Sequence, residues 1–129
     1  MKALTVLAST ATLVMAMNAH ATETVQEAPS AAIDRITLLY MNHKIYPSGA
    51  VVCDPKVVGA RSVVGCWNLT SSGKSAPNIW PYEAGNFKSL NGSARQLAEG
   101  KFSNESGVSA MKLPLPADID VGAVVESFK

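Results

Sequence analysis

The sequence predicts a mainly β fold, with α+β as the alternative. The expected form is a small antiparallel sheet or sandwich-like domain with one or two short helices and one disulfide-linked hairpin. Two observations lead to this prediction. The stretch VVCDPKVVGARSVVGCW, residues 51–67, contains both cysteines of the chain and can pair with itself around a glycine. Residues 35–41 are rich in β-branched and aromatic side chains, which favour strands.

The first 21 residues predict a signal peptide. Lys2 precedes an uncharged stretch of apolar and small side chains over residues 3–17, and residues 19–21 read Ala-His-Ala, an A-x-A cleavage pattern. A membrane-spanning helix needs about 20 apolar residues, more than this stretch provides. We therefore expect cleavage before Thr22. The alanine-rich signal with its short positive segment is typical of bacteria. The mature chain is expected in the periplasm or the extracellular medium, with no membrane span.

The mature chain predicts a short leader followed by one domain. Residues 22–31 are polar, include Pro29 and show no periodicity, as expected of a flexible leader. Residues 32–129 have the length of a single globular domain. Once Lys2 is removed, ten basic residues balance ten acidic ones. Nucleic-acid binding requires a basic stripe, so we expect no nucleic-acid partner.

Residues 35–41 predict the first strand. Ile36, Leu38 and Tyr40 would share one face, and the opposite face is also largely apolar, as in a covered central strand. The same residues also fit a helix that begins at Ser30, because apolar side chains recur there at helical spacing. The strand is the favoured interpretation.

The hairpin prediction depends on one register. Gly59 followed by Ala60 suits a type II′ turn, in which glycine occupies the first central position. Counting outward from this turn places Cys53 directly opposite Cys66, at a non-hydrogen-bonded pair whose Cα atoms lie about 4.5 Å apart, within reach of a disulfide. The same count places Pro55 where the ladder requires no N–H, and proline favours an edge strand.

The two cysteines are expected to form a structural bridge. Exported proteins usually pair their cysteines, and closing a loop of about 14 residues stabilises a fold by roughly 3 kcal/mol. Redox catalysts instead place their two cysteines in a C-x-x-C motif, which Cys53 and Cys66 do not form.

The C-terminal third predicts short elements. Ser93, with a glutamine three residues later, fits a capping box and predicts a helix over residues 93–99. Residues 108–113 predict a strand. Residues 118–128 fit either a helix capped by Asp118 or a final strand, and both interpretations stay open.

The glycine- and proline-rich segment 70–92 predicts an irregular loop and holds the candidate binding site. Loops on a scaffold commonly carry function, and tryptophan and tyrosine are enriched at binding hot spots. The alternative is that these aromatic side chains fold back into the core beneath the loop. The predicted ligand-binding residues are three aromatics and two neighbouring lysines: Trp80, Tyr82, Phe87, Lys74 and Lys88.

Catalysis is the second hypothesis. His43 is the only histidine beyond the predicted signal peptide, and zinc sites usually need several His or Cys ligands. We therefore expect no metal and no cofactor. Asp118 and Asp120 lie in the only acidic cluster. The favoured function is a non-enzymatic binding or envelope-associated module that recognises a protein or glycan partner, ahead of a small secreted hydrolase that uses His43 or the aspartates.

Overall fold

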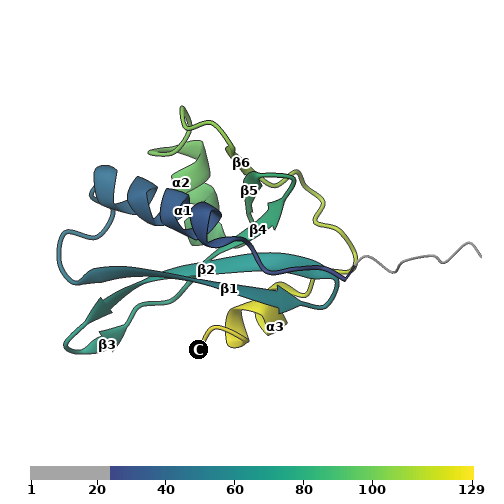
Figure 1. The fold of residues 1–129 in the computed structure, drawn as a ribbon, viewed down its shortest axis with the longest axis horizontal. Coiled ribbons are helices and arrows are strands. Elements are labelled where there is room, and N and C mark those ends of the chain that lie inside the picture. Colours follow the sequence, from purple (N-terminus) through teal and green to yellow (C-terminus); the bar gives the residue numbers. More distant parts are fainter. Residues whose placement is uncertain (1–23) are drawn as a thin grey trace, which may run out of the picture.

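The computed structural model describes residues 24–129 of the chain (Figure 1). The predicted signal peptide, residues 1–21, and its cleavage point lie outside the described residues. Within the described range the elements follow one another in the order α1 (Ser30–Asn42), β1 (Ala50–Val58), β2 (Arg61–Thr70), β3 (Gly73–Lys74), β4 (Asn78–Glu83), β5 (Asn86–Ser89), α2 (Gly92–Glu99), β6 (Val108–Ala110) and α3 (Val121–Glu126).

The described strands form one open, mixed sheet in the order β1-β2-β4-β5-β6, with β3 paired to β2. Every pair is antiparallel except β5–β6, which is parallel. The parallel pair arises because α2 connects β5 to β6, and parallel neighbours require such a crossover. The prediction of a mainly β domain is therefore confirmed in its α+β form, with one parallel pair in place of a wholly antiparallel sheet and three helices where one or two were expected.

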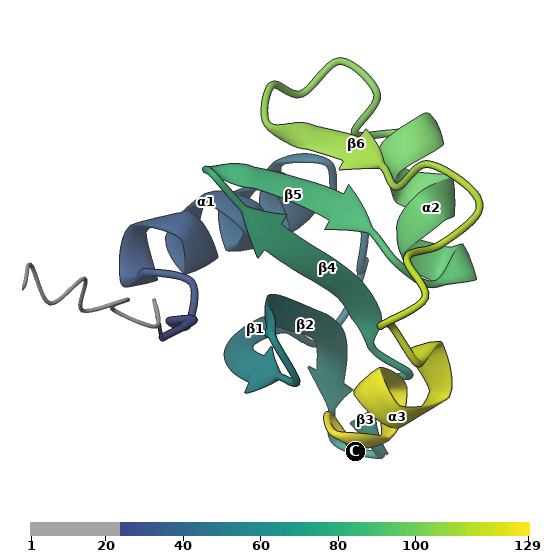
Figure 2. The same cartoon turned by 90° about the vertical axis from the view of Figure 1, so that its right-hand side faces the viewer.

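Helices α1 and α2 pack on one face of the sheet, and α3 packs on the other (Figures 1 and 2). Each face has its own buried cluster. The first core, under α1 and α2, includes Ile36, Tyr40, Val64, Cys66, Trp80, Phe87, Ala94, Phe102 and Val108. The second core, under α3, consists of Val63, Trp67, Ile79, Leu90, Met111, Val124 and Phe128.

Residues 35–41 belong to helix α1, so the favoured strand interpretation is wrong. Ala32, Ile36 and Tyr40, spaced four residues apart, are buried along one side of the helix. Leu38, which a covered strand would bury, is 52% exposed. A helix on a sheet needs to bury only one stripe of side chains. Both periodicities were present in the sequence, and packing against the sheet selected the helix.

The first core also reaches into the predicted leader, residues 22–31. Ala28 is buried as part of this core, and α1 already begins at Ser30. The domain boundary predicted at residue 32 therefore lies too far along the chain, and the packed domain starts near Ala28.

The predicted hairpin is confirmed, including its register. Cys53 faces Cys66 across β1 and β2, and their sulfur atoms are bonded, with the Cα atoms 4.1 Å apart. Gly59 has a φ of +61° while Ala60 has no positive φ, in agreement with a type II′ turn. Pro55 lies on β1, which is an edge strand. Local turn chemistry was sufficient to predict this part of the sheet.

The segment 70–92 is not the predicted irregular loop, because it contains β4 and β5. Pro81 lies opposite Val63 in the β2–β4 ladder, and the β4–β5 ladder begins only at the next pair, Tyr82 with Phe87. Counting from the β1–β2 turn makes the Pro81–Val63 pair a non-hydrogen-bonded one. No ladder therefore needs the N–H that Pro81 lacks, and the strand tolerates proline.

The C-terminal elements confirm one helix and resolve the open alternative. Helix α2 is present, but its N-cap residue is Asn91 and no side chain caps it, so the predicted cap at Ser93 is wrong. Residues 118–128 contain helix α3 rather than a strand. Its cap is Asp120, whose carboxylate accepts a hydrogen bond from the Ala123 N–H, and not Asp118 as predicted.

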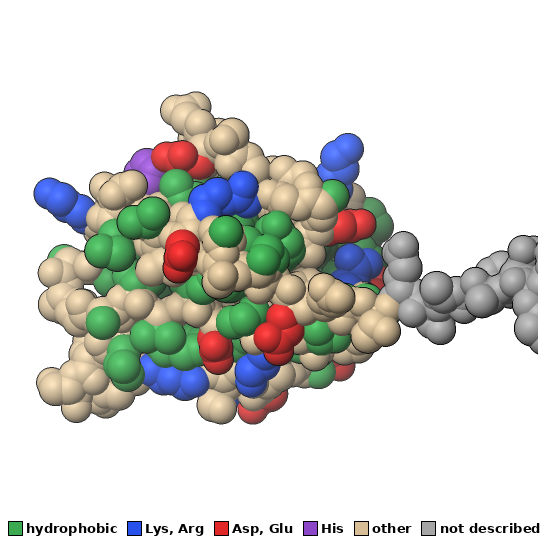
Figure 3. Space-filling view, in the orientation of Figure 1, with side chains coloured by type: hydrophobic (Ala, Val, Ile, Leu, Met, Phe, Trp, Pro, Cys, Tyr) green, Lys and Arg blue, Asp and Glu red, His purple; other side chains and the backbone are tan. Residues whose placement is uncertain are grey.

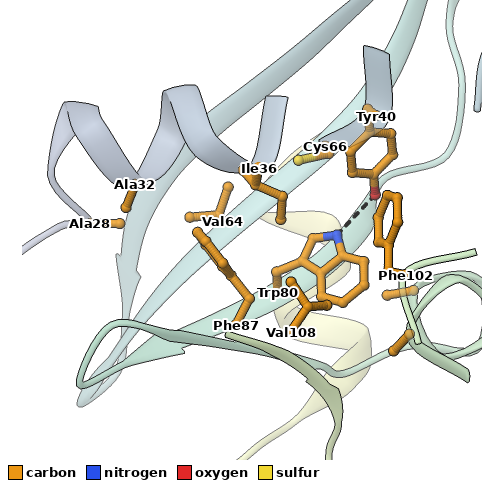
Figure 4. Close-up of a cluster of buried hydrophobic side chains, with 12 residues drawn as sticks. Ala28, Ala32, Ile36, Tyr40, Val64, Cys66, Trp80, Phe87, Phe102 and Val108 are labelled. Atoms are coloured by element: carbon orange, nitrogen blue, oxygen red, sulfur yellow. Dashed lines mark hydrogen bonds between the residues drawn. The ribbon is translucent and has the colours of Figure 1, made fainter. Parts of the chain in front are cut away.

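A buried polar cluster ties α1 to the sheet inside the first core (Figure 4). The Tyr40 hydroxyl accepts hydrogen bonds from the Trp80 indole N–H at 2.9 Å and from the Asn78 amide at 2.8 Å. The same amide donates to the Tyr46 hydroxyl at 3.1 Å. These bonds satisfy polar groups that would be costly to bury unpaired.

We expect the domain to lose stability in alkaline solution. Burial raises the pKa of Tyr40 above the ordinary value for a phenol. It also raises the pKa of Tyr46, which is less deeply buried. An unfolded chain releases these protons near pH 10, whereas the folded chain holds them, so stability is complete below pH 10 and falls above it. The slope should approach about 1.4 kcal/mol per pH unit for Tyr40 alone.

Urea denaturation at several pH values between 9 and 12 measures this slope. Tyr40→Phe is the control: it should be less stable throughout, since two buried donors lose their acceptor, and its stability should depend less on pH. Equal slopes for both proteins would contradict the assignment to Tyr40.

Candidate functional site

The structure separates the predicted binding residues into core residues and surface residues. Trp80 and Phe87 are both 0% exposed and belong to the first core, so the prediction that they form an exposed recognition loop is wrong. Their side chains point from β4 and β5 toward α1 (Figure 4). Strand pairing explains the outcome, because alternate residues of a strand that crosses a domain must face its core.

Lys74 has a structural role at the C-terminal segment. Its ammonium lies 4.4 Å from the centroid of the Trp67 ring and donates to the Phe128 carbonyl. Lys56 donates to the Ser127 carbonyl and lies over the Phe128 ring. Lysines placed in this way satisfy carbonyl groups left free at a helix C-terminus. Lys74 is therefore engaged in holding α3 against the sheet.

Phe128 anchors this segment above Gly65. A Cβ atom at Gly65 would lie 2.5 Å from the Phe128 ring, so only glycine lets the ring approach the strand this closely. The C-terminal segment thereby covers the part of the sheet that carries the second core.

Tyr82 and Lys88, the other two predicted residues, line an open groove of about 1160 Å³. The groove forms where the sheet divides. Strand β4 pairs with β2 only as far as Pro81, and from Tyr82 onward it pairs with β5 instead. Figure 2 shows β4 running away from β2 toward β5. The β1–β2 turn and the β4–β5 turn thus stand apart on the two sides of the groove.

Part of the groove lies on the same face of the sheet as α3, although Tyr82, which also lines it, packs partly against the first core. Lys88 and Ser109 are paired neighbours on β5 and β6, and both are exposed. They alternate with Phe87 and Val108, which face the first core, so their side chains point to the opposite face. The remaining walls come from the leader, the β1–β2 turn and the segment before α3: Val25, Gln26, Ala60, Arg61, Ser62, Lys112, Pro114, Pro116 and Asp118.

An ion pair lines the groove. The Arg61 guanidinium donates to both carboxylate oxygens of Asp118, at 2.8 and 3.1 Å. This hydrogen bonding holds the pKa of Asp118 below its ordinary value. Lys88, Lys112 and Glu83 also line the groove, and within residues 24–129 they make no ion pair. Two lysines and one glutamate thus remain available to a ligand.

A second, smaller pocket of about 110 Å³ lies beside the groove. Arg61, Pro81 and Asp118 line both cavities. The other walls of the pocket are mainly aliphatic and come from the β1–β2 turn, the end of β5 and α3: Val58, Val63, Leu90, Ile119, Ala123 and Val124. Asp120, the cap of α3, also lines it. The ion pair therefore lines both the open groove and the mainly aliphatic pocket.

The candidate catalytic residues occupy separate places. His43 follows α1, where its Nε2 lies 2.7 Å from Glu105 and its ring packs edge-on against Phe102. Asp118 is paired with Arg61 at the β1–β2 turn, at the other end of β1 (Figure 1), and Asp120 caps α3. No group of three or more potential metal ligands occurs in the part of the chain that the structure describes.

Sequence reasoning missed most of the groove. Its residues come from the leader, the β1–β2 turn, β4 to β6 and the segment after β6, and no local pattern marks them. The sequence marks Asp118 only as a candidate catalytic or capping residue. The weak signal available was the combination of Pro81 with a following aromatic, since proline marks the point at which a strand leaves its partner.

On the face seen in Figure 3, acidic and basic side chains are interspersed with hydrophobic ones. No helix of the described residues is long and apolar enough to cross a membrane. No protein-family model, curated protein or solved structure matches this chain.

Proposed function

We propose that the protein is an exported, non-enzymatic binding module whose groove holds an extended segment of a protein or glycan partner. The groove itself carries the proposal: about 1160 Å³ of open space exceeds the usual volume of a small-molecule pocket, roughly 300–1,000 Å³. Two lysines that make no ion pair within residues 24–129 and an adjoining, mainly aliphatic pocket provide polar and apolar contacts side by side.

Two further observations support export. The disulfide between Cys53 and Cys66 is typical of an oxidising compartment. Residues 1–21 carry the pattern of a cleavable signal. The intact mass of the exported protein should correspond to a chain that starts at Thr22, and a species that retains Met1 would contradict the proposed cleavage.

Site-specific photocrosslinking in the native cells tests the groove. A photoreactive amino acid at Ser109, an exposed groove residue, is expected to capture a partner. The same replacement at Ser71, an exposed residue of the β2–β3 turn outside the groove, is the matched control. The Ser109 product should also disappear when Lys88→Glu and Lys112→Glu are introduced together. If Ser109 captures nothing beyond what Ser71 captures, the groove is not a binding site.

A further inference from the structure

We propose that the partner is an extended peptide that carries an aliphatic side chain next to acidic residues, an inference that rests on the groove being the binding site. The peptide would lie along the groove, insert the aliphatic side chain into the smaller pocket, and place its carboxylates near Lys88 and Lys112.

The smaller pocket favours a peptide over a glycan. Its volume of about 110 Å³ equals the space that about four water molecules take up in the liquid, which suits a small aliphatic side chain. Its walls include Val58, Val63, Leu90 and Val124. Apolar walls gain free energy when an apolar group replaces water, and a sugar offers no aliphatic side chain to insert. Extended peptides are commonly recognised in this way, with side chains in pockets next to a sheet.

The charges beside the pocket favour an acidic sequence. Arg61 and Asp118 neutralise each other through two hydrogen bonds. Asp120 lines only the smaller pocket, where its carboxylate accepts a hydrogen bond from the Ala123 N–H as the cap of α3. The remaining charged residues of the groove are two lysines, Lys88 and Lys112, and one glutamate, Glu83. Within the groove itself the excess is one positive charge, and both lysines are exposed, so an acidic segment placed there, away from Asp120, gains favourable electrostatic contacts at a small cost of desolvation.

A segment of the chain before α1 already lies against this groove. Val25 and Gln26, which belong to neither a helix nor a strand, line it. Val25 remains 38% exposed and does not line the smaller pocket. In the leader, acidic residues flank this valine, which is the composition that we propose for the partner. Because Val25 does not line the smaller pocket, the leader leaves that pocket free for the partner's side chain.

Selection of a phage-displayed random heptapeptide library on the oxidised chain from Thr22 to Lys129 tests the proposal. Enriched peptides should share one Leu, Ile or Val with a neighbouring Asp or Glu. Replacement of that aliphatic residue by serine in a fluorescein-labelled peptide should weaken binding at least tenfold in fluorescence anisotropy.

Matched protein variants locate the contacts. Ala123→Leu adds bulk at an exposed pocket residue of α3 and should weaken binding at least tenfold, whereas Ala31→Leu, at an exposed position of α1, should not change it. Lys88→Glu together with Lys112→Glu should weaken binding about tenfold and reduce its dependence on salt.

The results separate this inference from the proposed function. If no peptide is enriched, or if the enriched peptides lack an aliphatic residue or bind the Ala123→Leu variant equally well, the peptide assignment is wrong. Crosslinking at Ser109 would then still establish the groove as a binding site for another class of partner. If Ser109 also captures nothing, both proposals fail.

Discussion

Replacement of Trp80 by alanine is expected to lower the free energy of unfolding by about 3–5 kcal/mol, as truncation of a large buried aromatic does. The Trp80 side chain is fully buried, and its ring lies 6.0 Å from that of Phe102, centroid to centroid. Its indole N–H also donates to Tyr40. The substitution thus removes apolar contacts, opens a cavity and deletes a buried hydrogen bond. A domain with an ordinary stability of 5–15 kcal/mol would lose a large part of it.

Urea denaturation measures the loss, with two variants for comparison. Trp80→Phe keeps much of the ring but lacks the N–H donor, so its cost should be smaller than that of Trp80→Ala. Tyr82→Ala, at a partly buried groove residue, should also cost less. If Trp80→Ala changed the stability by no more than about 0.5 kcal/mol, as at an exposed site, Trp80 would be a surface residue after all.

Removal of the disulfide is expected to have the second largest effect. The bridge joins positions 13 residues apart, and closing a loop of this size restricts the unfolded chain by about 3 kcal/mol. In the variant Cys53→Ala/Cys66→Val, we therefore expect a loss of about 2–4 kcal/mol. Valine is chosen at position 66 because Cys66 is fully buried in the first core and an apolar side chain keeps that site filled.

The wild-type protein under reducing conditions is the control, and it should lose a similar amount of stability. Non-reducing peptide mapping should recover residues 53 and 66 in one linked fragment, since the described residues contain no free cysteine. A titratable thiol in protein recovered from an oxidising compartment would contradict the bridge.

The success of the hairpin prediction and the failure at α1 have the same physical origin. Around Gly59 the structure is set by neighbours in sequence: a turn that needs glycine first, an alternation of bonded pairs, and two cysteines whose separation allows a bridge. In residues 35–41 the local pattern is compatible with two periodicities. Only the sheet against which Ile36 and Tyr40 pack distinguishes them.

The prediction of an irregular loop over residues 70–92 fails for a related reason. Pro81 excludes a hydrogen-bonded ladder position, but the sequence does not show which position it occupies. In the fold it falls opposite Val63 at the end of one ladder, just before the next ladder begins. Its neighbours Trp80 and Tyr82 share one face of the strand: Trp80 is buried in the first core, and Tyr82 packs partly against that core and lines the groove. Neither role is visible without the positions of β2 and β5.

The sequence by itself determined the hairpin, its disulfide, its turn and its register, together with the location of helix α2, because each depends on residues close along the chain. Tertiary structure alone decided that α1 is a helix, that Trp80 is core and that a groove exists. The groove depends on segments separated by up to about ninety residues, from Val25 to Asp118. Such a site arises from the path of the whole chain, and local propensity and spacing carry no information about which distant side chains will meet.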